Sequence, residues 1–446
     1  MSQARLLITG IKSGSGKTTV TCGLLCALKE RGFNIKAFKC GPDYIDPMFH
    51  KKALGVLSGN LDSFFCDEKT LKYLLMRNEA ERDIAVIEGA MGYYDGAGGG
   101  FAGSSYDVAW LTQTPVILVA DCKGMSNTAA AVIKGIADYR KDSNILGVIL
   151  NRISAKQFEN AKCRIEEECN VRVLGFLPNL QNIVFTSRHL GLLSPDDISD
   201  IKEKLEIIKR AVLENIDMDA LVAIGEGAPH ISCEEVSVEK FKNELNIAVA
   251  RDEAFSFYYE ENLDLLQRMG ARLSFFSPLS GDKIPDGTDI ILLGGGYPEE
   301  YPLELSKSPT GGYIREAYRS GVKIIAECGG YMYLKEYIED KNNNRFPMCG
   351  ILKGDVKYAG RLVRFGYVTL KKRGLPGFKN SIKGHEFHHW DSDSNGDGFT
   401  AVKTDGSSYP CIYHDTKLLA GFPHLYYYSN PEFVHEIIRE WGIANE

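Results

Sequence analysis

A glycine-rich segment near the start of the chain, residues 10–19, constrains the fold more than any other stretch. It reads Gly-Ile-Lys-Ser-Gly-Ser-Gly-Lys-Thr-Thr, follows a short apolar run (residues 5–8) and precedes a helical pattern of leucines. A strand, a glycine-rich turn and a helix in this order are the setting of a phosphate-binding loop. The glycines let backbone N–H groups approach phosphate oxygens at the helix N-terminus. The segment therefore predicts a nucleotide-binding domain.

This loop departs from the strict pattern at one position. The pattern places glycine five residues before Gly16, where this chain has Ile11, and an extra lysine, Lys12, stands nearby. Lys17 is expected to reach the outer phosphates, and the Thr18 hydroxyl to contact Mg²⁺. A chance glycine-rich turn is the alternative. The predicted ATP contacts in the loop are Lys12, Ser13, Gly14, Ser15, Gly16, Lys17, Thr18 and Thr19.

Composition narrows the classes of protein. The 446 residues suggest about two to four domains, and the net charge of −7 without a long basic run argues against nucleic acid as a partner. No apolar run is long enough to predict a membrane span or a signal peptide. Eleven cysteines without paired Cys-x-x-Cys spacing favour reduced thiols. We therefore expect a cytoplasmic protein that does not bind membranes.

Apolar runs alternate with helical patterns along the first half, which indicates βαβ units around a mostly parallel sheet. Ligands of such a sheet bind at the carboxyl ends of its strands. Predicted strands are residues 6–9, 34–39, 84–88, 115–120, 145–150 and 171–177, with helices that include 18–31, 126–140, 156–168 and 196–215. Residues 225–238 have the composition of a linker. The predicted domains are 1–225 and 245–446, joined by the linker 226–244.

Polar residues follow the predicted strands. Glu88 ends a strand downstream of the phosphate loop, where a carboxylate that positions Mg²⁺ or water belongs, and a strand-end cap is the alternative. Residues 40–50 hold two acids and a tyrosine in a Pro-rich turn, which turn chemistry alone also explains. Asn151 is a candidate for contact with the purine base, or a plain turn residue. Arg188 is a candidate for an anionic ligand, although surface arginines are commoner.

A cysteine in the second half lies where a nucleophile would. Cys328 follows a predicted strand and precedes two glycines and a helix, so we expect an elbow that exposes the sulfur and lowers its pKa. An inert core cysteine is the alternative. Gly294 and Gly295 after the preceding strand, with Gly329, are predicted oxyanion donors. His424, late in the domain, is the candidate base. A histidine-rich cluster, residues 384–390, is interpreted as substrate contacts or interdomain structure rather than a metal site.

These motifs together resemble those of the cobyrinic acid a,c-diamide synthase family, over nearly the whole chain and in the family's order. They are residues 13–19, 41–47, 60–62, 88–96, 188–192, 250–259, 293–299, 327–330 and 384–388. The resemblance implies an α/β protein of two domains. The first is an ATP-dependent, amide-forming parallel-sheet domain of the dethiobiotin-synthetase type, and the second is a class I-like glutamine amidotransferase domain.

The resemblance also implies the reaction. Glutamine would acylate Cys328, with His424 as base, and release ammonia inside the protein. ATP would phosphorylate the a- and c-acetate carboxylates of a corrin-type macrocycle, and ammonia would displace the phosphate. Cobyrinic acid is the expected ring, while hydrogenobyrinic acid and nickel-sirohydrochlorin stay alternatives. The implied cofactors are ATP and Mg²⁺, the substrates are L-glutamine and the macrocyclic acid, and a homodimer is one expected assembly.

Roles for individual residues of the first domain follow from the same resemblance. Asp95 would help to activate the substrate carboxylate. The implied Mg²⁺ group is Thr18, Asp43 and Glu88, and the implied substrate contacts are Asp43, Tyr44, Ile45 and Asp62.

The chain departs from the family in two places. Class I amidotransferases usually carry Glu two residues after the catalytic His, and relatives here commonly carry a second His, but this chain has Tyr426. We therefore expect a Cys–His dyad, with Glu327 and Glu386 as guesses for the group that orients His424. Residues 177–179 lack an arginine that relatives often carry, which puts one anion contact in doubt.

Two other functions compete with this one. A nucleotide-switch ATPase of the partitioning or septum-placement type is suggested by Lys12, but such proteins have no use for an amidotransferase domain. A catalytically dead C-terminal module is the other alternative. Dependence of ATP turnover on a macrocyclic acid separates the first alternative from the synthase, and the Cys328→Ser variant separates the second.

Overall fold

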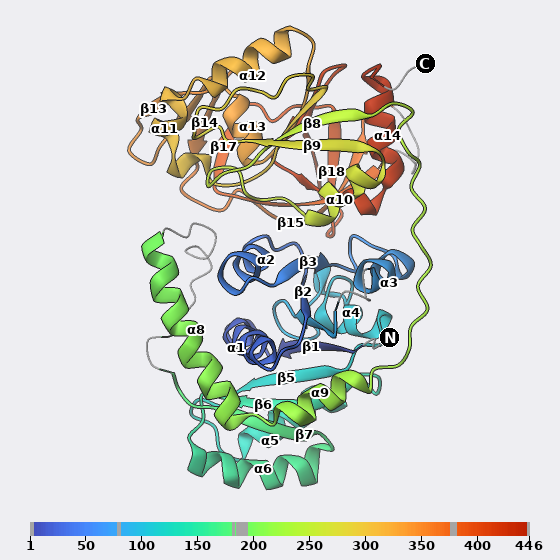
Figure 1. Cartoon of the computed structure of the whole chain (residues 1–446), viewed down its shortest axis with the longest axis vertical. Coiled ribbons are helices and arrows are strands. Elements are labelled where there is room, and N and C mark those ends of the chain that lie inside the picture. The colour runs from blue at the N-terminus through green and yellow to red at the C-terminus, as the bar shows by residue number, and fades with distance from the viewer. Residues whose placement is uncertain (1–3, 78–81, 181–182, 184–194, 375–380, 444–446) are drawn as a thin grey trace. The chain divides into compact units, whose positions relative to one another are not determined.

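The computed structural model describes residues 4–77, 82–180, 183, 195–374 and 381–443 (Figure 1). The chain divides into two compact units, Met1–Val236 and Ser237–Glu446. Each unit has a parallel sheet of its own, which confirms the predicted α/β class. In the part of the chain that is described, no helix is long and apolar enough to cross a membrane.

The first unit, in its described residues, is built on a seven-stranded parallel sheet in the order β3-β2-β4-β1-β5-β6-β7. Strands β1 and β4 are buried along their whole length, as expected for parallel strands covered on both faces. The strands are β1 (Arg5–Gly10), β2 (Ile35–Cys40), β3 (Leu57–Leu61), β4 (Ile84–Glu88), β5 (Val116–Asp121), β6 (Ile145–Asn151) and β7 (Arg172–Leu177).

Helices connect these strands, because parallel pairing needs a crossover connection. Helices α1, α8 and α9 contribute to one hydrophobic core with the sheet. Gly23 of α1 allows a close approach to α8, since an added Cβ would lie 2.5 Å from the side chain of Ile208. The helices are α1 (Lys17–Glu30), α2 (Ile45–Phe49), η1 (His50–Leu54), α3 (Glu68–Met76), η3 (Ala97–Gly99), α4 (Ser105–Leu111), α5 (Thr128–Asp138), α6 (Ala155–Cys169), α8 (Pro195–Asn215) and α9 (Met218–Glu226).

The second unit holds a sheet in the order β20-β21-β11-β10-β8-β9, parallel except at β20, among its described residues. Two smaller sheets, β13-β12-β14-β17 and β19-β18-β15-β16-β22, complete it. Its strands are β8 (Leu245–Ala250), β9 (Ala271–Phe276), β10 (Ile290–Leu293), β11 (Lys323–Glu327), β12 (Tyr337–Glu339), β13 (Arg345–Pro347), β14 (Asp355–Tyr358), β15 (Arg364–Lys372), β16 (Ser381–His388), β17 (Trp390–Ser392), β18 (Phe399–Lys403), β19 (Ser408–Cys411), β20 (Tyr413–His414), β21 (Leu418–Gly421) and β22 (His424–Leu425).

Helices cover this sheet as well, and a buried cluster that includes Phe255, Ile314 and Tyr331 joins them to it. They are α10 (Glu260–Arg268), η4 (Pro298–Glu300), α11 (Pro302–Lys307), α12 (Thr310–Arg319), α13 (Gly329–Leu334), η6 (Tyr427–Ser429) and α14 (Pro431–Glu440).

The junction between the units differs in detail from the predicted linker. Gly225, assigned to a linker-like segment, lies inside α9, and a Cβ there would be 3.1 Å from Leu6. The boundary between the compact units falls after Val236, and β8 begins at Leu245. The limits of the domains stay a prediction.

Candidate functional site

The glycine-rich segment forms a tight loop between β1 and α1. Gly14 and Gly16 have φ of 76° and 91°, a left-handed conformation that suits glycine. The Ser15 hydroxyl donates to the carbonyl oxygen of Lys12 at 2.9 Å, which closes the loop on itself. Helix α1 begins at Lys17, so the unpaired amides of its first turn face the loop. This is the geometry of a phosphate cradle.

Lys17 is buried behind this loop. Its ammonium donates to the carbonyl oxygens of Lys12, at 3.2 Å, and of Met91. Burial lowers the pKa of Lys17 to about 8, and Lys39 adds to the effect, while Asp95 opposes it. Asp95, the predicted activating residue, is therefore within electrostatic reach of the phosphate-loop lysine.

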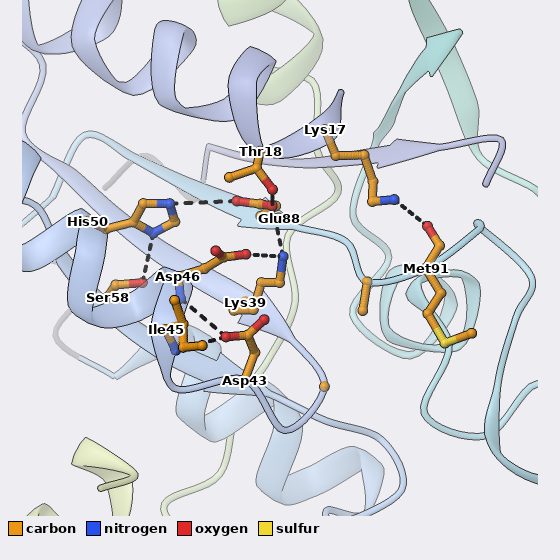
Figure 2. A network of polar contacts seen from close by, with 12 residues as sticks. Lys17, Thr18, Lys39, Asp43, Ile45, Asp46, His50, Ser58, Glu88 and Met91 are labelled. Carbon is orange, nitrogen blue, oxygen red and sulfur yellow. Dashed lines mark hydrogen bonds and ion pairs between the residues drawn. The ribbon is translucent and has the colours of Figure 1, made fainter. Parts of the chain in front are cut away.

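Glu88 is the centre of a buried network at the carboxyl end of β4 (Figure 2). Its Oε1 accepts from Thr18 Oγ1 and from Lys39 Nζ, both at 2.7 Å, and its Oε2 lies 3.6 Å from His50 Nε2. Lys39 Nζ also lies 2.5 Å from Asp46 Oδ2. Burial alone would raise the pKa of Glu88, but Lys39 and His50 outweigh it and hold that pKa well below its usual range. Glu88 is thus an anion at neutral pH.

Three members of this network were missed by sequence reasoning: Lys39, Asp46 and His50. Asp43, predicted as a Mg²⁺ ligand, accepts instead from the N–H groups of Ile45 and Asp46 at 2.8 and 3.1 Å, and so organises the start of α2 (Figure 2). Asp43 as a ligand stays a prediction. Lys39 is a charged residue inside the largely buried strand β2, one position before its end and paired with Glu88 of β4, and this charge in a buried strand is the signal that identifies it.

The donor set fits Mg²⁺. The Thr18 hydroxyl donates to Glu88 Oε1 at 2.7 Å, and both groups are hard oxygen donors. Asp46 is held by Lys39, and burial raises its pKa to about 8. In the described residues no group of three or more His, Cys, Asp and Glu side chains is arranged to hold a metal. Mg²⁺ commonly takes only one or two carboxylates and completes its shell with water and substrate phosphates. The site therefore suits a metal that arrives with a nucleotide.

The predicted substrate contacts lie on the loops after β2 and β3. Tyr44 is buried, and Ile45 packs its half-buried side chain against the core. Asp62 is fully buried, and its Oδ1 accepts from the N–H groups of Phe64 at 2.8 Å and Phe65 at 3.4 Å. These contacts organise the turn after β3. Contact of these residues with a macrocycle stays a prediction.

Asn151 and Arg152 support the phosphate loop from the end of β6. Asn151 Nδ2 donates to the carbonyl oxygen of Ser15 at 2.9 Å, so this nitrogen is committed to the loop. The predicted contact with a purine base stays a prediction, and it would be made by Oδ1 of the same side chain. Arg152 donates to Gly14 O at 3.3 Å and pairs with Asp121. Sequence reasoning missed Arg152, and its position directly after Asn151 is the signal for it.

Cys328 lies on a strained turn between β11 and α13. Its φ of 48° and ψ of −106° are sparsely populated by residues other than glycine. The Cys328 N–H donates to Gly421 O at 2.8 Å, and the Gly330 N–H donates to Gly294 O at 2.9 Å, which holds the turn. A strained strand–turn–helix of this kind presents a nucleophile. The sharp turn predicted from the sequence is present.

The predicted state of the thiol is wrong. Cys328 is only 7% exposed, and burial raises its pKa well above the usual value, with Glu299 as the next cause. The Gly329 N–H lowers it, but helix α13 is only six residues long and does not overcome the desolvation. The thiol is therefore neutral and needs a base to remove its proton as it reacts.

His424 lies against the glycine loop that follows β10. Its ring packs on Gly295, where an added Cβ would lie 2.2 Å from His424 Cε1. Burial lowers the pKa of His424 to about 3, and His385 and His388 add to this effect. The imidazole is neutral at physiological pH and can accept a proton. The same loop bonds to the turn of Cys328, so both residues border one loop.

The three predicted oxyanion donors stay a prediction. The Gly294 N–H donates to the Tyr258 hydroxyl at 2.8 Å, so it would have to leave that partner to bind an oxyanion. The Gly329 N–H faces the sulfur of Cys328.

The close contact between Gly295 and His424 gives a direct prediction. In the Gly295→Ala variant the new methyl displaces the imidazole, so glutamine-dependent activity is expected to fall about 100-fold, as a base moved by about 1 Å does. Activity with ammonia is expected to persist. The matched control is Gly312→Ala in α12, where an added Cβ meets nothing within 4 Å. Equal activity of the two variants with glutamine would refute this placement of His424.

Two motifs need separate mention. The histidine-rich cluster lies on β16 and β17, where His388 stacks on Phe422 with ring centroids 3.9 Å apart and its Nδ1 contacts Trp390 O at 2.7 Å. Arg188 and the motif at residues 188–192 lie outside the described residues.

Comparisons with known proteins agree with this arrangement. Residues 6–190 match the model of the CobQ/CobB/MinD/ParA nucleotide binding domain, and residues 246–431 match that of the CobB/CobQ-like glutamine amidotransferase domain. Proteins named cobyrinate a,c-diamide synthase are similar to this chain along its length. They include those of Priestia megaterium (34% identity, covering 100% of this chain and 99% of the relative), Fusobacterium nucleatum (38%, 97% and 99%) and Thermoplasma acidophilum (37%, 98% and 100%).

The family is assigned from both halves of the chain together, because the match of one half alone is less specific. The nucleotide-binding model is shared by CobQ, CobB, MinD and ParA, whereas the relatives named cobyrinate a,c-diamide synthase match this chain over nearly their whole length and its own. The phosphate cradle of the first unit and the cysteine elbow of the second match that pairing. This chain belongs to the cobyrinate a,c-diamide synthase family.

Proposed function

We propose that this protein is an ATP- and glutamine-dependent ligase that converts the a- and c-acetate carboxylates of cobyrinic acid into amides. The observation that carries the proposal is the presence, in one chain, of a phosphate cradle with a buried anion behind it and a cysteine elbow with a neutral histidine. A nucleotide-switch ATPase has no use for the second unit. The relatives named after this reaction match both units.

In the second unit, Cys328 acts as the nucleophile on the side-chain amide of glutamine. As Sγ forms a bond to the amide carbon, the Sγ proton passes to His424, and Gly295 and Gly329 donate to the developing oxyanion. The C–N bond then breaks, and the nitrogen leaves as ammonia with the proton that His424 returns. Water hydrolyses the thioester to glutamate. The neutral thiol and neutral imidazole suit this order, since the proton moves only when the attack begins.

In the first unit, a substrate carboxylate attacks the terminal phosphorus of ATP, and the P–O bond to ADP breaks. Ammonia then attacks the carbonyl carbon of the acyl phosphate, inorganic phosphate leaves, and the nitrogen loses a proton as the amide forms. Lys17 and the amides of the phosphate loop hold the phosphate charge, and Asp95 orients the attacking carboxylate. Thr18 and Glu88, with Asp43 as the third predicted ligand, would hold Mg²⁺, which supplies positive charge to the phosphates when bound. Lys39 pairs with both Glu88 and Asp46. It helps to keep Glu88 ionised, whereas burial outweighs it at Asp46 and raises the pKa of that carboxyl to about 8.

The macrocycle and the setting of the enzyme are part of the proposal. Hydrogenobyrinic acid and nickel-sirohydrochlorin present similar acetates, and cobyrinic acid is favoured by the names of the relatives. The cytoplasm is the proposed location, because all eleven cysteines are free thiols. A homodimer is the proposed assembly.

Mass spectrometry of candidate rings tests the function. The protein is incubated with ATP, Mg²⁺, glutamine and one of the three macrocycles. Two successive replacements of an acid by an amide on cobyrinic acid, absent without ATP, are expected. Amidation of nickel-sirohydrochlorin alone would keep the chemistry and change the substrate. If no ring is amidated by a protein that hydrolyses ATP, the switch-ATPase alternative replaces the proposal.

A further inference from the structure

We infer that Glu327 is the positioning residue for His424: its carboxylate accepts the Nδ1–H of the imidazole and leaves Nε2 to take the proton of Cys328. This inference deepens the proposed function and rests on its glutaminase chemistry. Sequence reasoning left two carboxylates, Glu327 and Glu386, as candidates for this role. Their contacts separate them.

Glu327 reaches His424 from the carboxyl end of β11, a strand of the parallel sheet. It is the last residue of β11 and is buried, and its Oε2 lies 4.0 Å from His424 Nδ1. Its Oε1 is 3.5 Å from the hydroxyl of Tyr427, which fixes the direction of the carboxylate. A separation of 4.0 Å is an ion-pair distance, and such contacts are often long in the free enzyme and shorten in the substrate complex. Cys328 follows Glu327 directly, so one chain segment carries the nucleophile and the group that orients its base.

The backbone of His424 is held independently of this contact. Asn262 Nδ2 donates to Leu425 O at 2.7 Å, and Asn262 Oδ1 accepts from the Tyr427 N–H at 2.8 Å. Strand β22 also pairs His424 with His385 of β16. With the main chain fixed on both sides, the remaining freedom of His424 is the rotation of its side chain. An acceptor at Nδ1 is what selects one ring orientation and tautomer.

Tyr426, at the place where class I enzymes usually carry the orienting glutamate, does not take over that role. It is 0% exposed, and its ring packs edge-to-face on Tyr259 with centroids 4.9 Å apart. The side chain therefore serves the core. The neighbouring residue, Tyr427, contacts Glu327 instead.

Glu386 also lies near the Cys328–His424 pair, but its carboxylate contacts residues other than His424. Its Oε2 accepts a close hydrogen bond from the Tyr409 hydroxyl, and its Oε1 lies 4.0 Å from Nε2 of His388 rather than from His424. His388 is itself committed to Phe422 by stacking. Glu386 is thus a buried carboxylate beside another histidine, which makes it a matched control for Glu327.

The contact between Glu327 and His424 is expected to depend on pH. Burial raises the pKa of Glu327 to about 8, and contacts with Leu425 and Tyr427 oppose this rise. Below that pH the carboxyl is protonated and cannot accept the Nδ1–H, whereas above it the carboxylate can. Glutamine use is therefore expected to rise with pH through about 8. The other titratable groups that face the Cys328–His424 pair are His385, His388, Glu299 and Glu386. Burial raises the pKa of Glu299 to about 8 and that of Glu386 to about 7, so the assignment of the rise to Glu327 comes from its variants and not from the parental profile.

The test compares full-length variants by glutamate release in the presence of ATP, Mg²⁺ and the macrocycle. In Glu327→Gln, kcat with glutamine is expected to fall by about 10-fold or more, because the imidazole loses the carboxylate that selects its orientation and tautomer, and KM is expected to change little. The rise of activity near pH 8 is expected to disappear. Amidation supported by ammonia is expected to be unchanged.

A second variant leaves the Glu327 carboxylate in place, so its result does not depend on whether Glu327→Gln folds. Tyr427→Phe removes only the hydroxyl that lowers the pKa of Glu327, so the rise of activity with pH is expected to move to higher pH. A residue that is merely structural would not shift this profile.

Glu386→Gln serves as the control and keeps the rise near pH 8. The inference is overturned if Glu327→Gln keeps the parental rate and profile, or if the rise disappears in Glu386→Gln instead. Failure of the proposed function looks different, because the parental chain then releases no glutamate from glutamine, and the inference falls with it.

Discussion

The Cys328→Ser variant is expected to lose glutamine-dependent amidation by at least about 1,000-fold while it still amidates with free ammonia. The serine hydroxyl is a far weaker nucleophile than sulfur, so the acyl-enzyme forms much more slowly. Ammonia needs no thioester, so the phosphate cradle of the first unit works as before. The measurement is the amide yield per minute with each nitrogen donor.

Cys349→Ser is the matched control, because Cys349 is a fully buried thiol of the same unit that forms no part of the elbow. It is expected to keep glutamine use. If Cys328→Ser, but not Cys349→Ser, loses amidation with both glutamine and ammonia, the result would argue against two separate sites. If Cys328→Ser keeps amidation with both nitrogen donors, the result would argue that the second unit is catalytically dead.

Lys17→Met is expected to abolish amidation with glutamine and ammonia alike, by about 1,000-fold or more. The methionine keeps the bulk of the buried stem but removes the charge that the phosphates need in the transition state. The glutamine site is in the other unit, so alkylation of Cys328 by a glutamine-like electrophile is expected to proceed at the parental rate. Amide yield and the alkylation rate are measured on the same preparation.

Lys69→Met provides the comparison, since Lys69 lies on the surface in an exposed pair with Glu234. Such pairs contribute about 0–1 kcal/mol, so the variant is expected to behave as the parent does. Amidation by Lys17→Met with ammonia at the parental rate would mean that the loop binds no reacting nucleotide.

Much of the fold was predictable because strong local signals coincide with it. The buried runs at β1, β4 and β10 are too apolar for any place but a sheet covered on both faces, and the glycine loops mark where two of them end. Strand β3 was missed, since Leu-Ser-Gly-Asn-Leu has little apolar pattern and pairs only with β2 at the edge. Its strand character comes from tertiary pairing that local sequence does not encode.

Candidate site residues were predictable where a short sequence motif points to one chemical role. Cys328 and Lys17 were identified in this way, and the sharp turn at Cys328 followed from its glycines. The thiol pKa was mispredicted, because burial depends on the packing of distant segments such as Glu299 and is invisible in the local sequence. Lys39 and Asp46 were missed for a related reason, since their role arises from side chains of β2, α2 and β4 that meet only in space.

The central claim, that ATP activates a carboxylate and glutamine supplies the nitrogen, is tested most directly with doubly labelled substrates. The macrocycle carries ¹⁸O in its acetate carboxylates, and glutamine carries ¹⁵N in its side-chain amide. Mass spectrometry then follows both labels. The account predicts one ¹⁸O atom in inorganic phosphate and one ¹⁵N atom in the ring for every amide formed. Amides that form while all released phosphate is unlabelled would contradict activation through an acyl phosphate.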